Sequence, residues 1–146
     1  MSVKETTAGT HTLSASYSGD SNYAPVGPIT RTYTVTAAAK TNLTSSLNPA
    51  TNCKPVPFSI TVAGAGSVMP TGKVLLKKGS TVLAAATLNE GHATVSTSAL
   101  TLGKNVLDAS YTGDAKYSPS TSAALTQVIV ACGLRAMNTA SSASVR

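Results

Sequence analysis

The sequence has few of the side chains that carry acid and base chemistry. Its 146 residues include five acidic residues, two histidines, one phenylalanine and no tryptophan, and only 11% of the chain is charged. An average soluble protein has about 25% charged residues. No Gly-x-Ser-x-Gly elbow is present, and too few groups remain for a Ser-His-Asp set or a cluster of three or four metal ligands. We therefore expect no enzymatic activity, no catalytic residue, no cofactor and no metal site.

Long apolar segments and clustered basic residues are also missing. No apolar run reaches the roughly 18 residues that span a bilayer, and residues 1–7 lack the apolar core of a signal peptide. The net charge is +6, but apart from Lys77 and Lys78 the basic residues stand alone, without aromatic neighbours for stacking bases. We expect neither a membrane span nor a nucleic-acid partner. The missing signal peptide leaves either a cytosolic protein or a fragment of a longer one.

An internal repeat favours the second of these. Residues 9–25 align with residues 103–119 at a constant offset of 94, and nine of the 17 aligned positions are identical. A period of this length is the size of one small β domain. Residues 36–129 make one full period, whereas residues 1–35 match only its last third. We therefore expect a fragment of a tandem array that begins within a repeat.

Short stretches of alternating apolar and polar residues predict strands. In residues 56–62 four apolar side chains alternate with three others, which is the period of a half-buried strand, and residues 107–111 alternate in the same way. Turn residues such as Asn48-Pro49 separate the stretches. Seven short strands with turns every 8 to 12 residues indicate an all-β fold, an immunoglobulin-like seven-stranded β-sandwich. The expected strands are residues 41–47, 56–62, 73–77, 81–88, 92–97, 107–111 and 122–130.

The apolar positions of these strands, with a few from the turns, form the expected core. Because alternate side chains of a strand point to opposite faces, only one set from each strand is assigned to it. The expected core residues are Leu43, Leu47, Val56, Phe58, Ile60, Val62, Val74, Leu76, Leu83, Leu88, Ala93, Val95, Leu100, Leu107, Ala109, Tyr111, Leu125 and Ile129.

Five strings of residues occur in order along the chain: Leu43–Pro49, Val56–Val62, Pro70–Val74, Leu88–Thr94 and Ala109–Asp114. Together they closely resemble bacterial immunoglobulin-like (Ig-like) repeats, which often occur in tandem in large secreted and surface proteins. The resemblance covers about residues 36–130 in full and residues 9–35 as a C-terminal piece. It implies that the chain is a spacer, stalk or adhesion module beside a separate functional domain. Cys53 departs from the pattern, which usually has a small residue there.

The two cysteines, Cys53 and Cys132, are expected to lie close together in this fold. Because the seven strands alternate in direction, the loop between the first two strands lies at the end of the sandwich where the last strand leaves. The even number of cysteines and the extracellular setting that the resemblance implies both favour a bond between them. We predict a Cys53–Cys132 disulfide, and the alternative is two unpaired thiols.

Two Tyr-x-Gly-Asp segments, ending at Asp20 and Asp114, are the most suggestive functional motif. Calcium takes six to eight oxygen ligands, whereas each segment brings one carboxylate. We favour a structural role, in which the glycine supplies a positive φ and the aspartate caps the turn. Tyr23 and Tyr117 are expected to cover the end of the sandwich. The alternative is that these four residues bind a ligand, with an exposed tyrosine stacked on a sugar ring.

The expected organisation has three parts. Residues 1–36 are the C-terminal part of a preceding Ig-like repeat, namely the hairpin of its last two strands; residues 37–132 are a complete Ig-like domain; and residues 133–146 are a disordered tail. We expect a non-catalytic spacer or adhesion module of an extracellular or cell-surface protein. Its expected partners are neighbouring repeats in the same chain and a surface glycan or protein. The alternative function is a carbohydrate-binding module appended to a secreted hydrolase.

Overall fold

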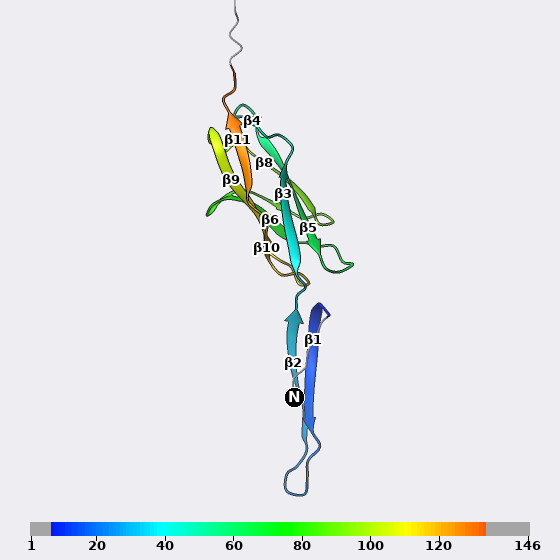
Figure 1. Ribbon diagram of the computed structural model, residues 1–146. Helices are drawn as coiled ribbons and strands as arrows, with labels where there is room; N and C mark the ends of the chain where they lie inside the picture. Colours follow the sequence, from blue (N-terminus) through cyan, green and yellow to red (C-terminus); the bar gives the residue numbers. More distant parts are fainter. Residues whose placement is uncertain (1–6, 134–146) are drawn as a thin grey trace, which may run out of the picture.

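A computed structural model describes residues 7–133 and places a two-stranded hairpin and a β-sandwich end to end (Figure 1). The expected disordered tail lies almost wholly outside the described residues. No helix within residues 7–133 is long and apolar enough to span a membrane. The hairpin consists of β1 (Gly9–Tyr17) and β2 (Val26–Val35). The sandwich consists of β3 (Ala39–Ser45), β4 (Ala50–Thr51), β5 (Val56–Gly64), β6 (Lys73–Lys78), β7 (Thr81–Thr87), β8 (His92–Thr97), β9 (Gly103–Tyr111), β10 (Ser120–Thr121) and β11 (Leu125–Val130).

Two sheets make up the sandwich, and the predicted all-β Ig-like fold is confirmed. One sheet has the order β3-β5-β8 and the other the order β4-β11-β9-β6-β7, with β10 also paired to β9. Two short strands were not expected: β4 follows the first expected strand of the sandwich, and β10 precedes the last one. All strand pairs are antiparallel except β4 with β11, which are parallel.

Between β3 and β4 the chain crosses from one sheet to the other. After β3 the backbone turns at Asn48, and the Asn48 side chain takes the place of a strand neighbour for β11. Its Nδ2 donates to the carbonyl of Thr126 at 2.8 Å, and its Oδ1 accepts the amide hydrogen of Val128 at 2.9 Å. The crossing brings β4 into parallel contact with β11, so that both strands end at the same pole of the sandwich.

The core lies between the two sheets and follows the expected alternation, most clearly in β5, where every second residue from Val56 to Val62 is buried. Leu47 was expected in the core, but this was wrong, because its side chain is 53% exposed. It lies in the crossing segment, where the alternation of β3 has already ended, and Ala50 of β4 fills the core instead. Leu83 and Leu125 are only partly buried and pack against the core.

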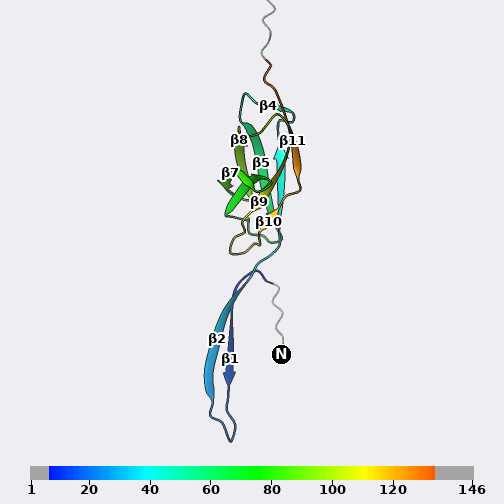
Figure 2. The same cartoon turned by 90° about the vertical axis from the view of Figure 1, so that its left-hand side faces the viewer.

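The chain enters and leaves the sandwich at opposite poles (Figures 1 and 2). We call the end where β3 begins the proximal pole; it comprises residues 64–72 and 112–119 and faces the hairpin. The end where β11 finishes is the distal pole, and it carries Cys53 and Cys132. Both views show the hairpin projecting from the proximal pole, away from the sandwich.

One face of the hairpin carries apolar side chains that no other described segment covers. Leu13 is 44% exposed, whereas Leu107, at the equivalent position of the repeat, is fully buried. Tyr17 and Ile29 on the hairpin are also exposed. Because β1 and β2 pair only with each other, the hairpin has the strand pairing of the last two strands of a sandwich without the opposite sheet.

Candidate functional site

The Tyr-x-Gly-Asp loop of the sandwich is organised by the carboxylate of Asp114. Its Oδ1 accepts the backbone amides of Lys116 and Tyr117, both at 2.8 Å. Its Oδ2 accepts the amide of Thr71 at 2.8 Å and the Thr71 hydroxyl at 3.0 Å. A carboxylate offers about four lone-pair positions, and all four are used within the protein. Asp114 therefore fastens its own loop to the loop that precedes β6, and its carboxylate has no open lone-pair position left for a cation.

The glycine of this motif is required by both conformation and space. Gly113 has a φ of 83°, in the left-handed region that side chains disfavour, and Gly19 in the hairpin has a φ of 82°. A Cβ at Gly113 would lie 2.9 Å from the carbonyl oxygen of Tyr117. The turn can therefore close tightly enough for the Asp114 carboxylate to reach the amides that follow it.

The hydrogen bonds at Asp114 shift its titration. Partial burial by itself would raise the pKa of Asp114, but the amides of Thr71, Lys116 and Tyr117 and the Thr71 hydroxyl outweigh that effect and hold the pKa well below its usual range. Burial first, and then the nearby Asp114 charge, raise the pKa of Tyr111. Both groups therefore have fixed charge states near neutral pH, with Asp114 ionised and Tyr111 neutral.

The lowered pKa of Asp114 predicts acid sensitivity. Because its folded-state pKa lies below the unfolded value of about 3.9, its contribution to the free energy of unfolding is complete above about pH 5 and is lost as the pH falls. Asp114→Asn should be less stable than the wild type at pH 7 and should lose less stability between pH 5 and pH 2. Urea unfolding at a series of pH values measures both effects.

Asp20→Asn is the matched control for this prediction. Asp20 occupies the equivalent position in the hairpin, outside the sandwich, so its replacement should leave the acid transition of the domain unchanged. An Asp114→Asn variant with the full acid dependence of the wild type would contradict the prediction.

Tyr117 is part of the core of the proximal pole. Its side chain is 2% exposed, and its hydroxyl donates to the carbonyl of Val68 at 2.6 Å. A Cβ at Gly64 would overlap the tyrosine ring, so the glycine makes room for it. Tyr117 therefore covers this end of the sandwich, and its burial leaves almost no ring surface on which a sugar could stack.

The same motif behaves differently in the hairpin. Asp20 Oδ1 accepts the amides of Asn22 and Tyr23 at 2.8 and 2.9 Å, as Asp114 does with its own loop, but Asp20 Oδ2 accepts the Tyr17 hydroxyl at 2.6 Å. This bond lowers the pKa of Asp20 and raises that of Tyr17. Tyr23 is 69% exposed. In the hairpin, the Tyr17 hydroxyl therefore donates to the aspartate oxygen that Thr71 binds in the sandwich.

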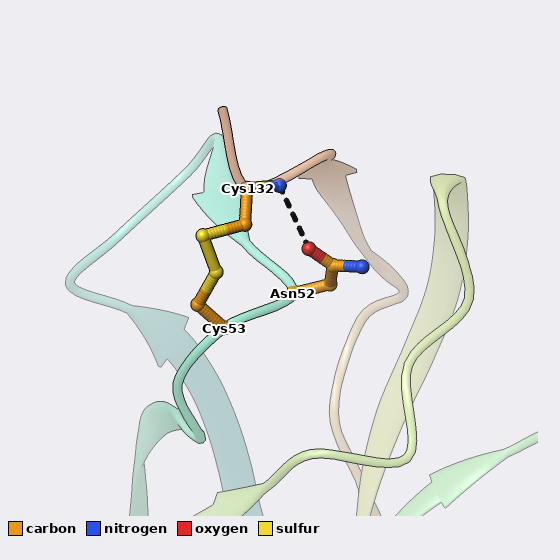
Figure 3. The surroundings of a disulfide bond; sticks show 3 residues. All are labelled: Asn52, Cys53 and Cys132. Carbon is orange, nitrogen blue, oxygen red and sulfur yellow. Dashed lines mark hydrogen bonds between the residues drawn. A yellow bond between two sulfur atoms is a disulfide. The ribbon is translucent and has the colours of Figure 1, made fainter. Parts of the chain in front are cut away.

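The two cysteines are joined by a disulfide at the distal pole (Figure 3). β4 and β11 end side by side there, with Thr51 opposite Val130, and each cysteine follows two residues later. Their Cα atoms lie 5.6 Å apart, within the usual range for a disulfide. Asn52 holds the two segments together, because its Oδ1 accepts the amide hydrogen of Cys132 at 2.8 Å and its own amide donates to Val130 at 3.1 Å.

The sequence also identifies the family. Residues 43–130, more than half of the chain, match the profile of the bacterial Ig-like domain (group 3). The chain belongs to this family. No curated protein and no solved structure matches it. Bacterial Ig-like domains are in general not catalytic and are structural modules typical of extracellular and surface proteins, and a disulfide fits that setting.

Sequence reasoning missed several polar residues that shape this Ig-like domain. Asn105 and Gln127 are fully buried. The Asn105 Nδ2 donates to the carbonyl of Thr101 at 2.7 Å, and its Oδ1 accepts Lys78 Nζ at 2.7 Å. Thr71, the partner of Asp114, was also missed. Each of the three residues also has a partner far away in the sequence, namely Lys78 for Asn105, Leu47 for Gln127 and Asp114 for Thr71, and no local pattern indicates such a pair. Within residues 7–133 no three His, Cys, Asp or Glu side chains lie together.

Proposed function

We propose that this chain is a non-catalytic spacer and adhesion module from a tandem array of Ig-like repeats in an extracellular or cell-surface bacterial protein. The observation that carries the proposal is that the chain enters and leaves the sandwich at opposite poles (Figure 1). A domain connected in this way adds its long dimension to an array. Family membership supports the same role.

We also propose the domain boundaries given by the repeat, with residues 1–36 as the last two strands of a preceding repeat and residues 37–132 as a complete one. The register of the Tyr-x-Gly-Asp motif supports this, because Asp20 retains both loop hydrogen bonds of Asp114 and lacks only the Thr71 pair. In a complete preceding repeat, the residue equivalent to Thr71 would take Asp20 Oδ2, and the Tyr17 hydroxyl would be released. The exposed apolar face of the hairpin would be covered by the opposite sheet.

The junction between the hairpin and the sandwich supports a spacer in which consecutive repeats keep a fixed orientation to each other. Ala37 forms a parallel bridge with Tyr117; its amide donates to the carbonyl of Lys116 at 2.7 Å, and its carbonyl accepts the amide of Ser118 at 2.9 Å. The hydroxyls of Thr36 and Ser118 are 2.7 Å apart. The connecting segment is thus fastened to the proximal pole immediately after β2. Fewer free dihedral angles remain there than in an unpaired linker.

The carbohydrate-binding alternative has less support. Tyr117 is buried, and Tyr23, although exposed, lies in the loop between β1 and β2, in the part of the chain that we assign to a preceding repeat. A hollow of about 400 Å³ at the junction is lined by residues that include Ala37, Gly66, Lys116 and Tyr117. The polar side chains around it are those of Thr7, Ser67, Lys116 and Tyr117. Because Tyr117 is buried and its hydroxyl is already bonded to Val68, the hollow offers no open aromatic ring for a sugar to stack on.

The test combines calorimetry with binding to polysaccharides. Because the lone-pair positions of Asp114 are already occupied, calcium should shift the unfolding midpoint of the oxidised chain by less than about 1 °C. Mucin, peptidoglycan and plant polysaccharides should show no saturable binding. A calcium shift of several degrees, or saturable binding that Tyr23→Ala abolishes, would overturn the spacer proposal in favour of a binding module.

A further inference from the structure

The disulfide divides the domain into a part that would bear tension applied along the chain and a part that would not. In an array, tension would enter the domain at Ala37 and leave after Cys132. Between these points the shortest covalent path follows β3 and β4 to Cys53 and then crosses the sulfur-sulfur bond to Cys132. The remaining strands, β5 to β11, all lie within the loop that the disulfide closes. They are attached to this path at both ends of the loop but are not part of it.

We propose that the Cys53–Cys132 disulfide diverts tension past residues 54–131, so that pulling the chain by its ends cannot extend them. The proposal rests on the spacer function for its biological purpose, but its geometry depends only on the disulfide and the strand order. Most of the core lies inside the protected loop, including Phe58, Ile60 and Leu107. Of the strands that bear tension, β3 contributes Leu43 and Thr41 to the buried set, and β4 contributes Ala50.

The position of the disulfide explains why tension bypasses nearly all of the chain after β4. Because β4 runs parallel to β11 and both end at the distal pole, the bond joins the chain close to its exit from the domain. A disulfide placed earlier in β11 would leave the rest of β11 in the path, and one placed within β5 would leave the first part of β5 in it. The repeat also shows that the bond occurs at a connection between domains, since Cys132 aligns with Ala38, which follows the fastened Ala37.

The length of the protected loop sets the size of the effect. The two cysteines are 79 positions apart in sequence and 5.6 Å apart in space. An extended chain spans ~3.3–3.6 Å per residue, so opening the disulfide should lengthen the fully extended chain by about 270 Å. Residues 37–53, which bear tension in the oxidised state, can extend to only about 55 Å by the same measure.

The bond is also open to chemical control, because Cys53 and Cys132 are both exposed. Dithiothreitol would transfer two electrons and two protons to it, break the sulfur-sulfur bond, leave two cysteine thiols and close into its own cyclic disulfide. The oxidised domain is then a short tether and the reduced domain a long one. An oxidising extracellular environment would keep the short form.

Single-molecule pulling of the full chain tests the proposal. Handles are fused to both termini so that neither cysteine is used for attachment, and the contour length of the fully unfolded chain is compared with and without dithiothreitol. We expect the reduced chain to be about 270 Å longer. The β1–β2 hairpin lies outside the loop, so it should contribute the same extension in both states.

The Cys53→Ser/Cys132→Ser variant is the matched control. Its contour length should equal that of the reduced wild type and should not change with dithiothreitol. Equal lengths for the oxidised and reduced wild type would overturn the proposed diversion and leave the spacer proposal standing. Saturable polysaccharide binding by a chain that shows the 270 Å difference would instead overturn the spacer role and leave the diversion intact.

Discussion

Replacing both cysteines by serine is expected to lower the free energy of unfolding by about 4 kcal/mol. In the chain-entropy model, a bond that closes a long loop removes conformations from the unfolded chain, and the effect grows slowly with loop length. The loop here spans 79 positions. Both side chains are exposed, so the substitutions should create no cavity. For a domain of this size, such a loss corresponds to a midpoint lower by roughly 15–30 °C.

Guanidinium unfolding of the oxidised wild type, the reduced wild type and the Cys53→Ser/Cys132→Ser variant measures this effect. The last two should agree within about 1 kcal/mol, because the bond is the common difference from the oxidised chain. An oxidised wild type no more stable than the variant would show that the bond adds no stability. Small domains are typically stable by 5–15 kcal/mol, so the expected loss is a large part of the total.

Tyr117→Ala is expected to cost the domain about 3–5 kcal/mol, the range for removing a buried aromatic side chain. The ring fills the space beside Gly64, and its hydroxyl satisfies the carbonyl of Val68. Removing the ring should also loosen the fastening of Ala37, because the bridge partner of Ala37 is Tyr117 itself. Denaturant unfolding measures the loss, and amide hydrogen exchange at Ala37 and Ser118 measures the loosening.

Two further variants separate the contributions at this position. Tyr117→Phe keeps the ring and removes the hydrogen bond to Val68, so it should cost only about 1 kcal/mol. Tyr23→Ala changes the equivalent tyrosine of the hairpin, which is exposed, and should leave the unfolding of the sandwich within about 0.5 kcal/mol of the wild type. A loss at Tyr117→Ala no greater than at Tyr23→Ala would contradict the core role of Tyr117.

The architecture was predictable because its signals are local. The alternation in residues 56–62 specifies one buried face wherever the strand lies, and the turn residues between strands limit where each strand can end. The proximity of Cys53 and Cys132 also followed from the sequence, since it needs only the number of strands and their alternating directions. The repeat at an offset of 94 came from direct comparison of the chain with itself.

The candidate site was predictable only in part, because a side chain is buried only when another segment of the folded chain covers it. Tyr23 and Tyr117 occupy equivalent positions and share their neighbours Asp and Pro, yet one is exposed and the other is buried. No pattern within either copy distinguishes them. The difference arises because the sandwich supplies Gly64 and Val68 around Tyr117, whereas no described segment of the chain covers Tyr23.

The sequence by itself therefore determined the fold class, the approximate positions of seven strands of the sandwich, the repeat and the proximity of the two cysteines. Only the tertiary structure decided that Thr71 completes the hydrogen bonds of Asp114, that Ala50 replaces Leu47 in the core, and that the disulfide encloses β5 to β11. The physical reason is the distance along the chain between the partners. Alternation and turns act over a few residues, whereas a hydrogen bond between residues 43 positions apart forms only after the sheets have packed.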